Sequence, residues 1–214
     1  MPTTPDETTS SRERIIVAAT DLFARRGYEA TSTRAIGDAA ELNIATVAYH
    51  VGSKAELYRE VMRRAHRAQG DAVLEALARL SGVAATPEAT RAALHGFVDA
   101  YLGFCLAHPE VPALWMRRWL DDGEGGDTID QEFAGPLVAR VATGVRELLD
   151  RAGIGDETDV EMLVYSIVWS THSFSKAGFV DATGTRRGAS SLAMIDRFRR
   201  HLHRLVDGAL QVVG

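Results

Sequence analysis

The stretch Thr31–Tyr58, TSTRAIGDAAELNIATVAYHVGSKAELY, decides the fold. Its apolar residues recur at helical spacing in two short runs, and only Glu41-Leu42-Asn43 separates them. A turn this short fixes the angle between two helices, so the second helix protrudes. Gly52 ends that helix, and Ser53 begins a longer one. The pattern predicts a helix-turn-helix, a motif that places a helix in a groove of DNA.

Residues before and within this stretch predict where each short helix begins and ends. Ser10 and Glu13 have the spacing of a capping box, and Gly27 is a natural helix stop. Thr31 is predicted to cap the next short helix, and Asn43 is predicted to cap the one after it. The sequence therefore predicts a three-helix head at the N-terminus.

The protruding helix and the helix starts offer groups that suit DNA. Small side chains allow close approach to base edges, and Thr46 can hydrogen-bond a base. Free backbone N–H groups at the helix starts, 31–33 and 53–54, favour a phosphate there. Each feature alone is more often a cap, a packing residue or a solvated surface group, so the argument rests on their combination. The predicted DNA-binding residues are Thr31, Thr33, Arg34, Asn43, Ile44, Ala45, Thr46, Ala48, Tyr49, His50 and Lys54.

This combination resembles the tetracycline-repressor (TetR) family of bacterial regulators. The family's N-terminal domain typically reads RxxILxAAxxLFxxxGYxxTSxxxIAxxAGVSxGTLYYHFxSKxxLY, and Arg12–Tyr58 follows that pattern over about a fifth of the chain. The residues in register are Phe23, Gly27, Tyr28, Thr31, Ile36, Ala40, Thr46, Tyr49, His50, Ser53, Lys54 and Leu57. The resemblance implies an all-α fold, with a C-terminal domain that binds a small molecule and dimerises through its last two helices.

Four positions depart from the family pattern. Glu41 stands where the turn usually has glycine, so the turn must avoid positive φ or tolerate modest strain. Ala45 replaces a usual glycine, Ala48 a usual tyrosine and Val51 a usual phenylalanine. These changes leave the fold prediction intact and affect which DNA sequence is bound.

Composition is that of an ordinary globular protein, with 46% hydrophobic and 25% charged residues. The net charge is −5, but residues 1–67 carry 10 Lys and Arg against 9 Asp and Glu, whereas residues 68–214 carry 14 against 20. No apolar run approaches the roughly 18 residues of a membrane span, and no signal peptide is recognisable. The single cysteine, Cys105, excludes an intrachain disulfide and a multi-cysteine metal site. We expect a soluble cytoplasmic protein without membrane association.

The rest of the chain is predicted to be helical, with no convincing strand. About nine helices are expected, three short and then six longer, with loops at 121–127 and 181–188, a kink at Pro136 and helix through 156–180. The predicted domains are a disordered tail at 1–10, the helix-turn-helix domain at 11–58 and a helical ligand-binding and dimerisation domain at 59–214.

Aromatic residues in the middle helices suggest a ligand pocket, which in proteins is mostly apolar with few polar groups. For any one of them, a plain core position is the commoner role. The candidate pocket residues are Phe97, Tyr101, Phe104, Trp115, Trp119, Phe133 and Trp169, with His172 as a polar anchor.

Motifs of common enzymes are absent: there is no HExxH, P-loop, GxGxxG or nucleophile elbow. His201 and His203 would lie on different faces of a helix, which makes them a poor metal pair, and Cys105 lies in an apolar helix. We therefore expect no catalysis, no cofactor and no metal.

The sequence predicts a ligand-responsive transcriptional repressor that binds a pseudo-palindromic operator as a homodimer. An apolar or aromatic small molecule would release it. The alternatives are an activator of the same family, or an all-helical protein- or ligand-binding dimer, enzyme or carrier without a role on DNA.

Overall fold

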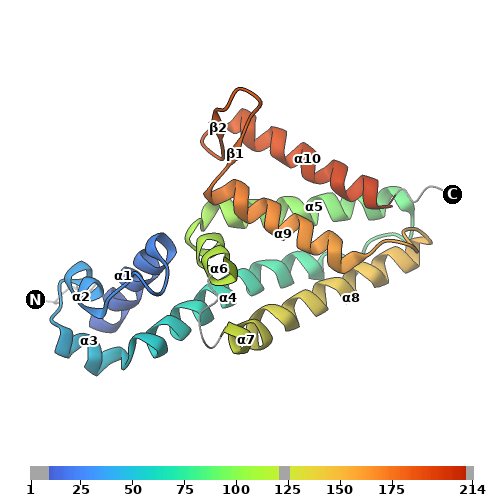
Figure 1. Ribbon diagram of the computed structural model, residues 1–214. Coiled ribbons are helices and arrows are strands. Elements are labelled where there is room, and N and C mark those ends of the chain that lie inside the picture. Colours follow the sequence, from blue (N-terminus) through green and yellow to red (C-terminus); the bar gives the residue numbers. More distant parts are fainter. Residues whose placement is uncertain (1–9, 121–125, 211–214) are drawn as a thin grey trace, which may run out of the picture. The chain divides into compact units, whose positions relative to one another are not determined.

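The computed structural model describes residues 10–120 and 126–210, which form helices and one short hairpin (Figure 1). The chain divides into two compact units, Met1–Ala65 and His66–Gly214. The division falls inside one helix, α4 (Lys54–Ala78), which contributes residues to both units. The prediction of an all-α chain with an N-terminal helix-turn-helix is confirmed. The tail predicted at 1–10, apart from Ser10, and most of the loop predicted at 121–127 lie outside the described residues.

The N-terminal unit contains three helices and the first part of α4. They are α1 (Ser11–Arg26), α2 (Thr33–Ala40) and α3 (Ile44–Val51). The Ser10 side chain accepts a hydrogen bond from the Glu13 N–H at 3.3 Å, as the capping-box spacing predicts, and Gly27 and Gly52 end α1 and α3. Arg64 of α4 donates to both carboxylate oxygens of Glu13 at 2.8 Å and so ties α4 to α1.

The C-terminal unit is built from the second part of α4 and the elements that follow it. They are α5 (Pro87–Ala107), α6 (Glu110–Leu120), α7 (Gly126–Ile129), the π-helical turn η1 (Asp130–Ala134), α8 (Gly135–Ala152), α9 (Val160–Lys176), β1 (Phe179–Val180), β2 (Arg186–Arg187) and α10 (Leu192–Leu210). Because α7, η1 and α8 follow one another without a break, the described residues hold nine helical segments, the number expected. Pro136, where a kink was predicted, lies in the first turn of α8, just after the π-helical turn η1.

The helix predicted through 156–180 ends earlier, at Lys176, and an antiparallel hairpin follows. Phe179 pairs with Arg187, and Val180 pairs with Arg186. Gly178 has φ 68°, and a Cβ at this position would lie 2.0 Å from the carbonyl oxygen of Arg187. The hairpin therefore depends on a residue without a side chain, which the apolar periodicity of the segment did not indicate.

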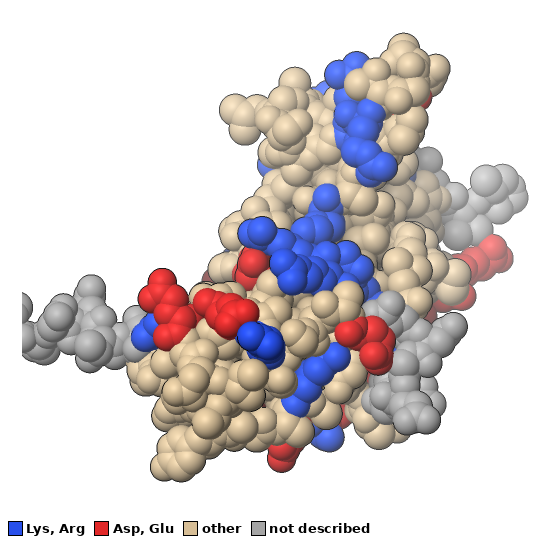
Figure 2. Space-filling view, turned by 60° about the vertical axis from the view of Figure 1, so that its left-hand side comes forward, with Lys and Arg blue, Asp and Glu red and all other residues tan. Residues whose placement is uncertain are grey.

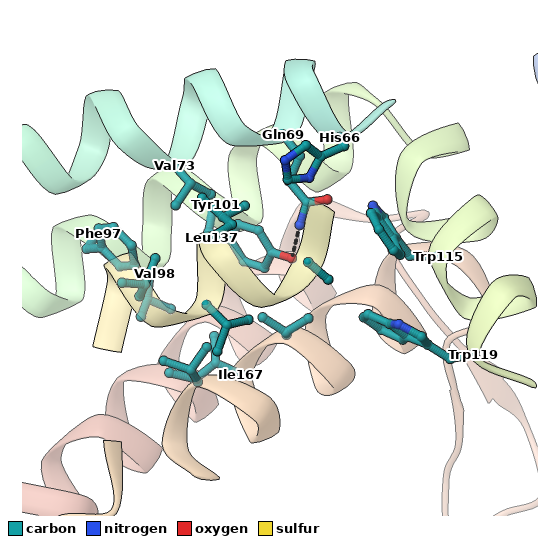
Figure 3. Close-up of a pocket in the computed structure, with 15 residues that line it drawn as sticks. His66, Gln69, Val73, Phe97, Val98, Tyr101, Trp115, Trp119, Leu137 and Ile167 are labelled. Carbon is teal, nitrogen blue, oxygen red and sulfur yellow. Dashed lines mark hydrogen bonds between the residues drawn. The ribbon is translucent and has the colours of Figure 1, made fainter. Parts of the chain in front are cut away.

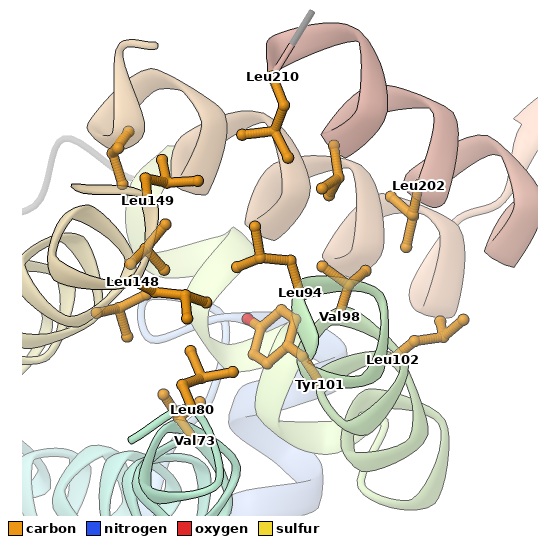
Figure 4. Packing of buried hydrophobic residues seen from close by; sticks show 14 of the residues in the cluster. Val73, Leu80, Leu94, Val98, Tyr101, Leu102, Leu148, Leu149, Leu202 and Leu210 are labelled. Carbon is orange, nitrogen blue, oxygen red and sulfur yellow. The ribbon is translucent and has the colours of Figure 1, made fainter. Parts of the chain in front are cut away.

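One apolar core holds the C-terminal unit together (Figure 4). It brings together buried side chains from α4, α5, α8 and α10, among them Val73, Leu102, Leu148 and Leu202. These side chains are at most 6% exposed, so four helices distant in sequence are fixed against one another. In the described part of the chain, no helix combines the length and the hydropathy that crossing a bilayer requires.

Candidate DNA-binding surface and ligand cavity

A local cap holds the start of α3. Asn43 Oδ1 accepts a hydrogen bond from the Thr46 backbone N–H at 2.8 Å, which confirms the predicted cap, and a second from the Thr46 hydroxyl at 3.0 Å. Because the hydroxyl already donates to Asn43, Thr46 has only lone pairs left to offer a base. A base contact at this position would therefore use Thr46 as an acceptor.

The turn before α3 contains a strained residue. Glu41 has φ 55° and ψ 43°, and in residues 10–120 and 126–210 no other non-glycine residue has positive φ. Its N–H donates to the Asp38 carbonyl at 3.2 Å, and the Leu42 N–H donates to the Gly37 carbonyl at 2.9 Å. This is the Schellman pattern, which normally has glycine at the left-handed position. Of the two outcomes predicted for this turn, the structure shows the strained one.

Arg14 and Gly37 support this turn from outside it. The Arg14 guanidinium donates to the Ala40 carbonyl at 2.5 Å and lies 3.5 Å from the Glu41 carboxylate. At Gly37, a Cβ would lie 2.8 Å from the carbonyl oxygen of Leu42. Gly37 thus lets the chain fold back against α2. The sequence carries no signal for the role of Arg14, because its partners lie 26 and 27 residues away.

The outer face of α3 is exposed and mostly small or apolar. Ile44 is 50% exposed and Tyr49 is 85% exposed, with the exposed Ala45 and Ala48 between them, whereas Val47 is 1% exposed and packs inward. Two alanines allow a backbone to approach base edges closely, and methyl groups suit the thymine methyl. The His50 ring stands edge-on to the ring of Tyr49 at 5.2 Å.

The start of α4 is closed by its own capping box. Ser53 Oγ accepts from the Glu56 N–H at 3.2 Å, and Glu56 Oε2 accepts from the Ser53 N–H at 2.7 Å and from the Ser53 hydroxyl at 2.8 Å. These hydrogen bonds, the backbone one first, lower the pKa of Glu56. Of the N–H groups predicted to favour a phosphate at 53–54, that of Ser53 is thus already bonded to the Glu56 carboxylate.

Lys54 is held against the end of the loop that follows α1. Its ammonium lies 4.1 Å from the centroid of the Tyr28 ring and 3.5 Å from the Glu29 carbonyl oxygen. The cation–π contact and the carbonyl position the charge without neutralising it. Lys54 therefore holds its positive charge in a defined position beside α3, and it forms no ion pair within the described residues.

Thr31 corrects the prediction at the start of α2. It is fully buried, and its hydroxyl donates to the carbonyls of Gly27 at 2.7 Å and Leu22 at 3.3 Å. Ser32 caps α2 instead, through a hydrogen bond from the Ala35 N–H at 3.1 Å. Thr31 joins the end of α1 to α2 and cannot contact DNA from this position.

On the face that Figure 2 draws, the basic residues do not form one continuous surface. Figure 2 shows Lys and Arg in separate patches, interrupted by uncharged and acidic residues. On α2, Thr33 is half-buried and Arg34 is exposed, and each is among the predicted phosphate contacts. Electrostatic attraction to a phosphate backbone would thus depend on a few placed groups.

The C-terminal unit contains an apolar cavity between α4, α5, α6, α8 and α9 (Figure 3). Its empty space is about 680 Å³, including the part open to solvent. Aliphatic side chains make up much of its wall, and none of its lining residues within the described chain is Asp, Glu, Lys or Arg. The wall includes Val73, Val98, Leu137, Val141, Val164, Ile167 and Val168.

One end of the cavity carries a buried chain of hydrogen bonds. Gln69 Nε2 donates to the Tyr101 hydroxyl at 3.0 Å, and that hydroxyl lies 2.7 Å from Nε2 of His172. Burial lowers the pKa of His172 to about 4, so its ring is neutral at pH 7, and burial raises the pKa of Tyr101. The Trp119 ring stacks on His172 at 5.4 Å.

Comparisons with known proteins agree with this arrangement. A family model described as "Bacterial regulatory proteins, tetR family" matches residues 15–61. The HTH-type transcriptional repressor KstR2 of Mycolicibacterium smegmatis is 36% identical over 62 residues, a match that spans 29% of this chain and 30% of that protein. Residues 15–61 of this chain therefore form a DNA-binding domain of the tetR type.

Solved structures extend the likeness in fold to both units of the chain. The ketosteroid transcriptional regulator KstR2 of Mycobacterium tuberculosis has a TM-score of 0.67 at 17% identity, over 94% of this chain and 96% of that one. A TetR-like regulator from Rhodococcus sp. RHA1 has a TM-score of 0.63 at 21% identity, over 94% and 95%. At such low identity, these likenesses establish the fold alone.

The structure divides the eight predicted pocket residues into two groups. Phe97, Tyr101, Trp115 and Trp119 line the cavity, and ligand binding by them stays a prediction. The other four do not line this cavity. These four, each packed behind the wall or outside it, are Phe104, Phe133, Trp169 and His172.

Each of the four has a different partner. Phe133 stacks on the cavity-lining His66 at 5.1 Å, and His172 lies behind Tyr101. Trp169 stacks on Trp119 at 5.9 Å and lines a different groove, beside α10. Phe104 lies beside His108 near the end of α5. The presence of aromatic residues in the sequence does not show which of them line the cavity and which pack behind its wall.

The sequence reasoning missed His66 and Gln69, the two cavity residues with polar side chains on α4. Gln69 is 8% exposed, and a glutamine on the buried stripe of a helix is a signal that could have identified it.

Proposed function

We propose that this chain is a transcriptional repressor that binds a pseudo-palindromic DNA site as a homodimer and is released when a small molecule occupies the cavity. The observation that carries the proposal is the exposed face of α3, whose first turn is fixed by the Asn43 cap. The match of residues 15–61 to the tetR family supports a regulatory role, and the matched relative in M. smegmatis is a transcriptional repressor.

The proposed DNA contacts follow from exposure and chemistry. Asn43, Ile44, Ala45, Thr46 and Ala48 would face base edges in the major groove. Side chains that carry a charge, an N–H or a hydroxyl would bind phosphates on either side. This second group comprises Thr33, Arg34, Tyr49, His50 and Lys54.

Two substitutions test this division of roles. Lys54→Ala should weaken binding to cognate and random DNA alike and lower the salt slope by about one, because one phosphate contact is lost. Thr46→Ala should change preference at one or two base pairs, by about 1–3 kcal/mol each. Fluorescence anisotropy on the DNA upstream of the chain's own gene, at several salt concentrations, measures both.

The control for these variants is Arg79→Ala, which removes an exposed arginine paired with Glu75 in the C-terminal unit. It should leave DNA binding unchanged. Absence of salt-dependent binding by the unmodified protein would defeat the DNA proposal outright. In vitro transcription from the bound site, with and without protein, then distinguishes a repressor from an activator.

Exposed apolar residues on α9 support the proposed dimer. Met162 is 55% exposed and Tyr165 is 56% exposed, and Met162 lines a groove between α9 and α10. A symmetric pair of α9–α10 faces would cover these side chains and place two α3 helices on one DNA site. Tyr165→Glu should produce a monomer by sedimentation and weaken DNA binding, whereas Leu120→Glu, at an exposed apolar position on α6, should do neither.

A ligand response is supported by the position of α4. This helix lines the cavity with His66, Gln69 and Val73 and carries Lys54 at its start. A ligand that prefers one position of α4 would shift the population of the protein towards that position. DNA release on ligand addition, measured by anisotropy, tests this step.

A further inference from the structure

The polar atoms of the cavity are concentrated at one end. The ring centroids of His66 and Trp115 lie 6.3 Å apart, and those of Trp115 and Trp119 lie 5.8 Å apart. Trp119 stacks on His172. His172 reaches Tyr101, and Tyr101 reaches Gln69, which lies one helical turn from His66 on α4. Figure 3 shows Gln69, His66 and the two tryptophans around this end, with Phe97 and aliphatic residues at the other.

Among the described side chains that line the cavity, two polar atoms have no partner. They are Gln69 Oε1, an acceptor, and Trp115 Nε1, a donor, and both are buried side-chain atoms without a hydrogen bond. Their residues are 8% and 2% exposed, and both line the cavity. Buried polar groups in folded proteins are normally satisfied, and an unsatisfied one costs free energy that a bound group can recover.

A hydroxyl offers both the donor and the acceptor that these two atoms lack. A hydroxyl can donate to Gln69 Oε1 and accept from Trp115 Nε1 at the same time, whereas a carboxylate has no proton for the glutamine oxygen and an ammonium has no lone pair for the indole. A charged group would also enter a cavity whose wall carries no Asp, Glu, Lys or Arg in the described chain. We propose that the effector is an uncharged, mainly apolar molecule with one hydroxyl, bound between Gln69 and Trp115. This inference rests on the proposed ligand response and specifies its chemistry.

The flat walls limit the shape of the effector near its hydroxyl. Trp115 and Trp119 have an interplanar angle of 33°, and Trp119 has its face against His172. A planar ring system therefore fits beside the tryptophans, with its apolar remainder against Val164, Ile167 and Val168.

A carbonyl oxygen is the strongest competing ligand group. With the amide of Gln69 turned over, its NH₂ and the Trp115 N–H would present two donors to one carbonyl. The arrangement in the structure instead has Gln69 Nε2 donating to Tyr101, which leaves the acceptor in the cavity. An alcohol and a ketone on the same ring system therefore separate the two possibilities.

The test uses four probes on a naphthalene skeleton: 2-naphthol, 2-acetonaphthone, 2-naphthoate and naphthalene. Isothermal titration calorimetry on the full chain should show 2-naphthol binding about tenfold tighter than each of the others, because each net hydrogen bond is worth about a factor of 2 to 12 in affinity. Equal affinities for naphthol and naphthalene, tighter binding of the ketone or the acid, or no binding of any probe would overturn the proposal.

Two variants locate the contact. Gln69→Leu and Trp115→Phe should each remove most of the preference for naphthol over naphthalene while naphthalene still binds. Gln131→Ala and Trp169→Phe, which change the same residue types outside the cavity, should keep the preference. Circular dichroism confirms folding, and Trp115→Phe decides the matter if Gln69→Leu is unfolded. A preference that survives both folded cavity variants would overturn the assignment to these two atoms.

The test also separates this inference from the proposed function. If naphthol binds as expected but does not release DNA, the ligand response fails and the chemical class of the site stands. If a different compound releases DNA and naphthol has no advantage over naphthalene, the class is wrong and the ligand response stands.

Discussion

The turn before α3 and the polar end of the cavity both contain energetically costly groups, but they are compensated in different ways. Glu41 adopts a left-handed conformation, and the cost is offset within the N-terminal unit by two backbone hydrogen bonds and the Arg14 guanidinium. At the cavity, Gln69 Oε1 and Trp115 Nε1 remain without partners. The first region is complete without a ligand, whereas the second has bonding capacity that a ligand could use.

The largest effect on stability is expected at His172, at the polar end of the cavity. Its pKa is about 4 in the folded chain and about 6.5 when exposed, so the unfolded state binds more protons between these values. Stability should therefore fall as the pH drops from about 6.5 to about 4, by about 3 kcal/mol from this residue. In His172→Gln this contribution disappears, and urea unfolding across that pH range measures the difference in slope.

The control for that measurement is His108→Gln, which replaces a half-exposed histidine after the end of α5. It should keep the pH dependence of the unmodified protein. If His172→Gln also keeps it in full, burial of a neutral ring at the cavity is not what limits stability in acid.

Gly37→Ala should have the next largest effect, about 2 kcal/mol of destabilisation. The new Cβ would lie 2.8 Å from a backbone oxygen of Leu42, so the turn must shift, and overpacking of this kind costs about 1–3 kcal/mol. Thermal unfolding measures the loss, and DNA binding should weaken with it because α3 would move. Gly96→Ala on α5 has no atom within 4 Å of the added Cβ and should be neutral or stabilising.

Glu41→Gly should stabilise the N-terminal unit by about 1 kcal/mol. Glycine adopts positive φ without the clash that L-residues incur, and the pair lost with Arg14 is an exposed one of little value. A rise in the midpoint of urea unfolding is expected. A fall would mean that the contact with Arg14, and not the backbone, governs the turn.

The smallest stability effect is expected for Glu56→Ala, which opens the capping box at α4. The loss of stability should be smaller than the stability changes given above. Gly37→Ala should weaken DNA binding, whereas Glu56→Ala should strengthen it. With the carboxylate gone, the Ser53 N–H is free for a phosphate, so non-specific DNA affinity should rise. Anisotropy with random DNA measures this. Unchanged or weaker binding would indicate that no phosphate approaches Ser53.

Local chemistry made much of the N-terminal unit predictable. The caps at Ser10 and Asn43, the ends of α1 and α3 and the inward position of Val47 all follow from neighbours within a few residues. Thr31 was misassigned because Thr31 and Ser32 are both good caps, and only packing decided that one would be buried.

The cavity was less predictable because its wall comes from five helices. Phe97 and Phe104 both lie on α5, yet only Phe97 lines the cavity. Gln69, Tyr101, Trp115 and His172 come from four different helices, so no spacing within the sequence could indicate that they meet. The type of a residue shows that its side chain is apolar, but it does not show which neighbouring side chain packs against it.

The sequence by itself determined the all-helical fold, the helix-turn-helix and the face of α3 that stays outside, because hydrophobic periodicity and caps act over a few residues. The tertiary structure decided the strain at Glu41, the burial of Thr31 and the two unpaired atoms beside the cavity. Each of these depends on groups brought together from distant parts of the chain, and burial against such groups sets which hydrogen bonds are made and which are left open.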